Sequence, residues 1–114
     1  MIFSLRLIIL LSFLVMHNAV ADVFNKKCIS QKTGASTFNI NLDTVILRGV
    51  LDYEFMGQKI TYEISKGKFS NSIFTGIATF LSSETGETHG KPFMITYDAK
   101  KNILTETNII YVCN

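Results

Sequence analysis

The chain has 114 residues and a formal net charge of +2, with 11 basic and 9 acidic side chains. The charges are scattered, with no run of like sign longer than the pairs Lys26–Lys27 and Lys100–Lys101. This pattern argues against a dedicated surface for nucleic acid or for anionic membranes, so we expect neither as a partner. No motif calls for a cofactor, and the length suits one domain with a modest core.

The first 21 residues have the order of features typical of a secretory signal peptide. Arg6 precedes the apolar run LIILLSFLVM at 7–16, and the small residues of AVA at 19–21 suit cleavage before Asp22. An N-terminal membrane anchor is the alternative, although the run is shorter than the roughly 20 apolar residues that a spanning helix needs. We predict a cleavable signal at 1–21, a single domain at 22–114, a secreted or periplasmic location and no membrane span after cleavage.

Alternation of apolar and polar residues, the pattern of a half-buried strand, recurs along the rest of the chain. In 37–42 the apolar positions are Phe38, Ile40 and Leu42, and in 44–54 the same face carries Val45, Leu47, Leu51 and Tyr53. No stretch has a convincing helical period. The expected strands cover residues around 24–31, 37–42, 44–54, 58–65, 72–82, 93–98 and 103–113.

Polar breakers that contain glycine or asparagine separate these segments, as in a meander of antiparallel strands. We therefore predict an all-β domain, a small meander that closes into an up-and-down barrel of seven or eight strands, with an open β-sandwich as the alternative. Two segments are apolar on both faces: Ile73–Leu81, and the last one, where Ile109 to Val112 are consecutive. The last strand should be paired on both sides, because an exposed apolar edge invites aggregation.

Both cysteines, Cys28 and Cys113, lie beyond the expected cleavage site. An exported chain enters a compartment where disulfides form, and no C-x-x-C pair points to redox or metal chemistry. We predict one disulfide between them, which would join the first and last strands at the seam of a closed barrel.

The one histidine after the signal, His89, follows Glu84 and Glu87 in the longest polar segment. Three ligands of this kind at most make a weak metal site, since the segment offers no second histidine and no thiolate. No nucleophile elbow or phosphate-binding glycine loop is present, and Asp52, Glu54 and Glu63 fit the polar face of a sheet. We expect no metal, no cofactor and no enzymatic activity, and we regard Glu84, Glu87 and His89 as partner contacts.

SKGKFSN, at 65–71, is a second candidate for contact with a partner. Lys66 and Lys68 flank Gly67, and Phe69 follows, so an exposed aromatic beside basic groups would suit an acidic partner. In the alternative, Phe69 packs into the end of the barrel.

The hairpin GKFSNSIFTGIATF, at 67–80, and the late cysteine resemble the bacterial periplasmic lysozyme inhibitors in outline. The resemblance implies a small exported β-barrel that binds a protein. This chain lacks the family's serine-containing signature and has no tryptophan, so no residue roles are carried over.

These patterns favour an exported, non-enzymatic binding protein with a protein partner in the envelope or outside the cell. An inhibitor or immunity-type factor acting through loops or a strand face is the first reading. The alternatives are a carrier with an apolar ligand inside the barrel, and a subunit of a surface assembly that uses Ile73–Leu81. The sequence does not fix the oligomeric state.

Overall fold

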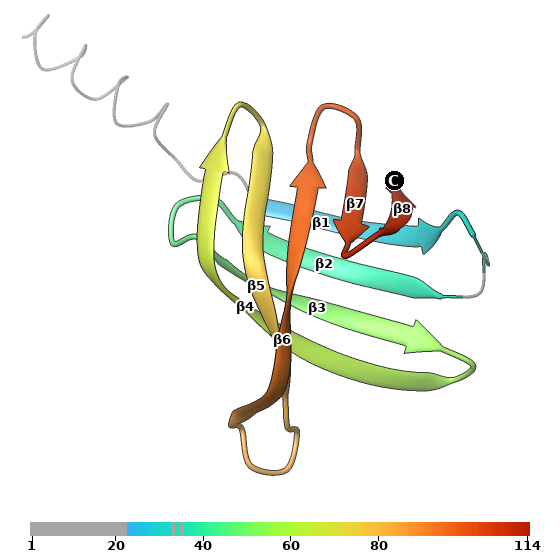
Figure 1. Ribbon diagram of the computed structural model, residues 1–114, viewed down its shortest axis with the longest axis vertical. Coiled ribbons are helices and arrows are strands. Elements are labelled where there is room, and N and C mark those ends of the chain that lie inside the picture. The colour runs from blue at the N-terminus through green and yellow to red at the C-terminus, as the bar shows by residue number, and fades with distance from the viewer. Residues whose placement is uncertain (1–22, 33, 35) are drawn as a thin grey trace, which may run out of the picture.

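The computed structural model describes residues 23–32, 34 and 36–114, so the predicted signal at 1–21 lies outside the described residues. The fold prediction is confirmed: the described chain forms a closed antiparallel barrel of eight strands (Figure 1). The strands are Val23–Ser30 (β1), Thr37–Asp43 (β2), Arg48–Phe55 (β3), Gln58–Ser70 (β4), Ile73–Leu81 (β5), Thr88–Asp98 (β6), Ile103–Glu106 (β7) and Ile109–Cys113 (β8).

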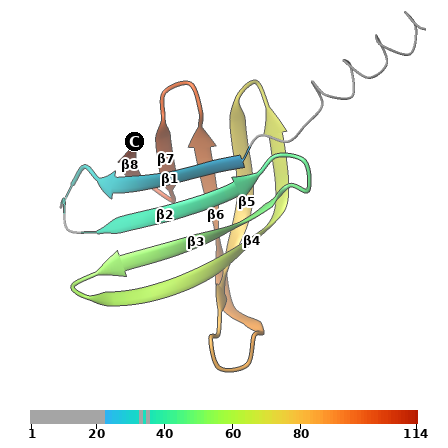
Figure 2. The same ribbon diagram turned by 180° about the vertical axis from the view of Figure 1, so that it is seen from behind.

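Each strand pairs with the next along the chain, and β8 returns to β1. In Figures 1 and 2, β1, β2 and β3 run across the view, whereas β5 and β6 run along its vertical axis. β4 belongs to both directions because a bulge between Ser65 and Lys68 bends it. At this bend Gly67 lies against the turn that precedes β3. A Cβ added to Gly67 would come within 2.3 Å of the Leu47 carbonyl oxygen. Only glycine allows so close an approach.

The core lies inside the barrel and is built by the predicted alternation. Phe38, Ile40 and Leu42 of β2 are all buried, as their spacing predicts. In β4 the bulge changes which positions face inward, so the inward series runs through Ile64 and then Phe69. Further buried side chains come from the other strands: Cys28, Leu51, Phe74, Ala78, Ile95, Tyr97, Leu104, Tyr111 and Cys113.

The expected strand at 44–54 begins later than predicted, at Arg48. Asp43 ends β2 and caps a turn: its side chain accepts hydrogen bonds from the backbone N–H groups of Val45 and Ile46, at 2.9 and 3.2 Å. Val45 is therefore 57% exposed rather than on the inner face. The hydrogen bonds of the Asp43 side chain favour a turn here, although the alternation of apolar and polar residues continues through Val45 and Leu47.

The expected strand at 103–113 is also corrected, because it is two strands joined by a turn at Thr107 and Asn108. Thr107 has a positive φ of 55°, which reverses the chain. The prediction that the last strand is paired on both sides is confirmed, since β8 lies between β7 and β1. Its outward residues Ile110 and Val112 remain largely exposed.

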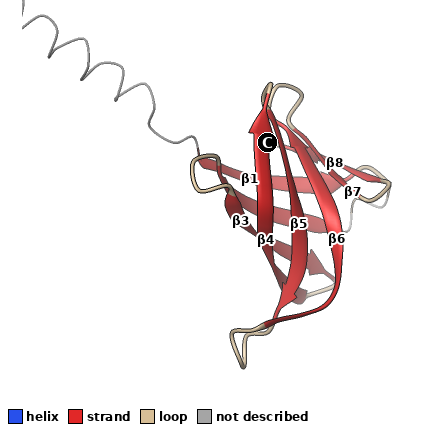
Figure 3. Cartoon of the chain, turned by 60° about the vertical axis from the view of Figure 1, so that its left-hand side comes forward, coloured by secondary structure: helices blue, strands red, loops and turns tan. Residues whose placement is uncertain are grey.

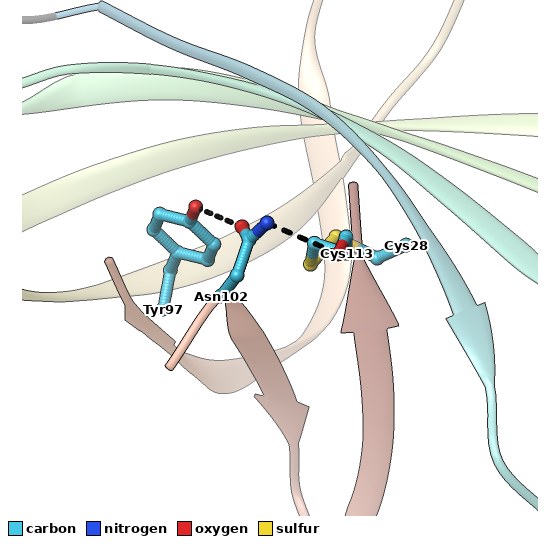
Figure 4. Close-up of a disulfide and its surroundings, with 4 residues drawn as sticks. All are labelled: Cys28, Tyr97, Asn102 and Cys113. Carbon is cyan, nitrogen blue, oxygen red and sulfur yellow. Dashed lines mark hydrogen bonds between the residues drawn. A yellow bond between two sulfur atoms is a disulfide. The ribbon is translucent and has the colours of Figure 1, made fainter. Parts of the chain in front are cut away.

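The predicted disulfide is confirmed, with the Cys28 and Cys113 sulfur atoms 1.98 Å apart (Figure 4). It lies at the β1–β8 seam, where only three residue pairs join the strands. Asn102 supports the same place: its side chain accepts a hydrogen bond from the Tyr97 hydroxyl and donates one to the Cys113 carbonyl oxygen. The end of the chain is thus held by covalent and polar bonds together.

Figure 3 shows strands and connecting loops throughout the described part. Within that part, no helix has the length and apolar character needed to cross a membrane.

Candidate functional site

The two ends of the barrel differ in how they are filled. At the end that holds the β2–β3, β4–β5 and β6–β7 turns, the Phe24 ring packs on Phe69 and Tyr97, with ring centroids 5.8 and 5.3 Å apart. Leu47 also packs against the core here. We call this the closed end (Phe24, Leu47, Phe69 and Tyr97), because large side chains fill it.

The opposite end, which holds the β1–β2, β3–β4, β5–β6 and β7–β8 turns, keeps a hollow of about 170 Å³. Phe38 and Tyr111 are almost fully buried and form its floor, whereas Ile109 is 39% exposed at its rim. We call this hollow the mouth, and its lining residues are Phe38, Tyr53, Tyr62, Phe93, Glu106, Ile109 and Tyr111.

Strand register brings the mouth residues together. Phe38 and Tyr53 are partners across β2 and β3, and Glu106 and Ile109 are partners across β7 and β8. The Phe38 ring packs against two others, and its centroid lies 4.9 Å from that of Tyr53 and 4.9 Å from that of Tyr111. The contact with Tyr53 is tilted, and the contact with Tyr111 is edge-to-face. Edge-to-face and tilted contacts of this kind stabilise aromatic clusters, so the lining is well defined in shape.

Burial raises the pKa of the Tyr62 and Tyr111 phenols above their usual value of 10.0, and the negative charge of Glu106 raises both further. The Tyr53 phenol adds to the same effect, while a side-chain hydrogen bond with Ser36 lowers the pKa of Tyr111. The Tyr62 and Tyr111 phenols are therefore neutral at physiological pH and present hydroxyl groups. Among the seven lining residues, Glu106 alone carries a charge.

A strip of rings leads from the mouth onto the β5–β6 hairpin, which projects beyond the barrel (Figure 3). The centroid of the Tyr62 ring lies 5.0 Å from that of Phe93 and 6.5 Å from that of Phe80. The Phe80 centroid in turn lies 4.7 Å from that of His89. His89, predicted to lie in a loop, belongs to β6, whereas Glu84 and Glu87 lie exposed in the hairpin turn. The structure thus places one predicted contact residue, His89, at the far end of this strip of rings and two in the turn of the hairpin.

The other predicted contact residues lie elsewhere. Lys66, Lys68 and Phe69 belong to β4, so the prediction that this segment lies in a loop between strands was wrong. The bulge keeps the segment in the sheet, with both lysines exposed and Phe69 packed at the closed end. The alternative in which Phe69 fills the barrel end is confirmed.

The outer carboxylates have local partners. Asp52 accepts a hydrogen bond of 2.7 Å from the Thr61 hydroxyl, and Glu63 lies 3.5 Å from the Arg48 guanidinium. Within the described ranges, no three residues of the types His, Cys, Asp and Glu gather as a metal-binding group.

A larger hollow, of about 440 Å³, lies beside the β3–β4 turn. Its lining includes Glu54, Phe55, Met56 and Gln58, and these are exposed residues. It is therefore a crease beside a hairpin, whereas the smaller mouth descends to buried rings.

Sequence reasoning missed Tyr53, Tyr62, Tyr111 and Glu106 as site residues. The three tyrosines were assigned to strands, where inward aromatic residues are ordinary core. The sequence does place tyrosines near strand ends, as Tyr53 and Tyr111 show, and this could have suggested a polar pocket at one end of the barrel. Which end is hollow depends on the strand register.

No family model, no curated protein and no solved structure matches this chain. The likeness to the periplasmic lysozyme inhibitors therefore rests on one hairpin and one cysteine.

Proposed function

We propose that this chain is an exported, non-enzymatic binding protein that receives a protruding group of a protein partner in its mouth, in the manner of an inhibitor or immunity-type factor. The observation that carries the proposal is the asymmetry of the barrel. One end is filled by Phe24, Phe69 and Tyr97, and the other keeps an aromatic hollow with neutral hydroxyls and one carboxylate. Aromatic, partly polar pockets are where binding energy concentrates in protein interfaces.

Export is part of the proposal, and the disulfide supports it. A bond between Cys28 and Cys113 persists in oxidising compartments such as the periplasm or the extracellular space. The apolar run that would direct export lies in residues 7–16.

The size of the mouth favours a partner's side chain over a carried molecule. Pockets for small-molecule ligands usually have about 300–1,000 Å³. The mouth has about 170 Å³, and the buried rings of Phe38 and Tyr111 belong to its lining. A single inserted side chain fits such a volume, so the carrier is the weaker reading.

The assembly reading, which the sequence places on Ile73–Leu81, has another apolar face in its favour at the β1–β8 seam. Ile29 and Val112 are partners across the seam, point outward and are 41% and 43% exposed, beside exposed Ile110. Gel filtration of the oxidised protein at high concentration tests it, because a monomer would contradict an assembly built on this face.

The binding proposal is tested by capture of a partner from envelope extract on immobilised oxidised protein. Two neighbouring residues give a matched pair: Ile109 lines the mouth, and Ile110 points away from it. Both side chains are exposed, so the fold should tolerate Ile109→Lys and Ile110→Lys. The two substitutions change the net charge by the same amount.

Wild type and Ile110→Lys should retain the same saturable partner, and Ile109→Lys should lose it, because a lysine at the rim fills the mouth. Absence of saturable capture by wild type would contradict the proposal. Loss in Ile110→Lys with retention in Ile109→Lys would place the contact on the outer face instead.

A further inference from the structure

The chemistry of the mouth indicates which group the partner inserts. We propose that the mouth binds the guanidinium group of an arginine side chain on the partner protein. This inference rests on the proposed function, since it names the part of the partner that enters the site. It is carried by three properties of the lining: its rings, its single charge and its size.

The aromatic rings of the lining would attract a cation through their π-systems. Five of the seven lining residues are aromatic: Phe38, Tyr53, Tyr62, Phe93 and Tyr111. A cation within about 6 Å of such a ring is attracted by the negative face of its π-system, and the attraction grows when water is excluded. Arginine does this more often than lysine, because its planar group also stacks on a ring.

Glu106 provides the charge. Within the described part of the chain, its carboxylate accepts a hydrogen bond of 3.4 Å from the Thr107 hydroxyl, and the ion pairs are Arg48–Glu63 and Lys59–Asp52. Its carboxylate is therefore available to a cation from outside. It would also repel an anionic group brought into the mouth.

The volume of the mouth and the tyrosine hydroxyls of its lining favour a flat group with several hydrogen-bond donors. A cavity of about 150 Å³ accommodates a benzene-sized molecule, and the mouth has about 170 Å³. A flat guanidinium with its first methylenes is of this size. Its five N–H donors match acceptors on Glu106 and on the hydroxyls of Tyr53, Tyr62 and Tyr111. An ammonium is compact and strongly hydrated, so it uses the ring faces less well.

The first test is calorimetric titration of the oxidised protein with n-butylguanidinium, n-butylurea and pentanoate as probes. The urea has nearly the same shape without the charge, and pentanoate carries the opposite charge. We expect saturable binding of n-butylguanidinium, binding at least about tenfold weaker for n-butylurea, and none for pentanoate. Equal affinity for n-butylguanidinium and n-butylurea would overturn the proposal.

A matched pair of variants tests the role of Glu106. Glu106→Gln keeps the side chain's shape and removes its charge, and Glu54→Gln removes a charge from an exposed position at the same end of the barrel. We expect Glu106→Gln to weaken n-butylguanidinium binding by about tenfold or more, and Glu54→Gln to leave it within about twofold. Similar losses in both would show only a general effect of charge and would contradict a built site.

Tyrosine absorbance gives an independent readout. Because a guanidinium stays charged well above pH 10, bound n-butylguanidinium should lower the apparent pKa of Tyr62 and Tyr111 by opposing Glu106. Bound n-butylurea excludes water without adding charge and should not lower it. A shift of the same sign with both probes would overturn the proposal.

The two proposals fail separately. If no protein partner is captured but n-butylguanidinium binds through Glu106, the protein partner is wrong and the chemistry of the mouth stands. If a partner is captured through the mouth and Glu106→Gln binds it as tightly as wild type, the binding function stands and the arginine is wrong.

Discussion

Cys28 and Cys113 face each other directly across the β1–β8 seam, with their Cα atoms 3.9 Å apart. The flanking bond from the Asn114 N–H to the Lys27 carbonyl oxygen shows that they form a non-hydrogen-bonded pair, the kind in which antiparallel strands approach most closely. The bridge therefore closes the barrel where its ladder is shortest.

Removal of the bridge should destabilise the barrel without changing its fold. For a loop that spans 85 residues, chain entropy sets an upper guide of about 4.5 kcal/mol. The double variant Cys28→Ala/Cys113→Ala should lose a few kcal/mol of unfolding free energy in urea titrations and keep its strand signal in far-ultraviolet circular dichroism. Unchanged stability would show that the seam does not need the bridge.

Asn102 should contribute through both its side chain and its backbone. It has a positive φ of 57° and bonds both Tyr97 and the Cys113 carbonyl oxygen. Asn102→Gly keeps the backbone freedom and loses the two bonds, at a cost of about 1–2 kcal/mol. Asn102→Ala should cost about 1 kcal/mol more, because alanine resists positive φ. Urea denaturation of the two variants measures this order, and equal stabilities would exclude the backbone contribution.

Gly67→Ala should be among the more damaging small substitutions. The added methyl would meet the Leu47 carbonyl oxygen at 2.3 Å and the Phe74 ring at 2.8 Å, so the bend of β4 must shift. We expect a loss of about 1–3 kcal/mol in thermal or urea unfolding. Lys68→Ala, at an exposed position one residue away, is the control and should lie within about 0.5 kcal/mol of wild type. A neutral Gly67→Ala would show that the close approach is not required.

Stability should fall in alkaline solution. Burial raises the folded-state pKa of Tyr62, Tyr97 and Tyr111 above 10.0, and negative neighbours raise it further. Above pH 10 the unfolded chain then binds fewer protons than the folded one, so unfolding becomes more favourable as the pH rises. Melting temperatures measured from pH 8 to pH 11 should be level at first and then decline beyond about pH 10.

Substitution separates this effect from general alkaline denaturation. Tyr62→Phe removes one of these phenols, which is partly buried, so its alkaline decline should be shallower than that of wild type. An identical pH profile would contradict the assignment to Tyr62.

The sequence predicts the fold well because period-two alternation reports which side chains face inward. Phe38, Ile40 and Leu42 follow it directly. The errors occur where local bonds or bulges interrupt it. Asp43 caps a turn at Val45, where alternation alone predicts a strand, and the bulge before Lys68 keeps in the sheet a segment that was predicted to be a loop.

The mouth is a different case, because alternation identifies inward residues and does not identify which end remains hollow. That depends on the strand lengths and on the register that places Tyr53 beside Phe38 and Glu106 beside Ile109.

The most direct test of binding in the mouth is a two-dimensional NMR titration of the oxidised protein with n-butylguanidinium. We predict saturable shifts confined to the mouth, at the rings of Tyr53, Tyr62, Phe93 and Tyr111 and at the backbone of Glu106, with the closed end at Phe24 and Phe69 unchanged. Shifts spread over the outer face, or centred on the closed end, would contradict it.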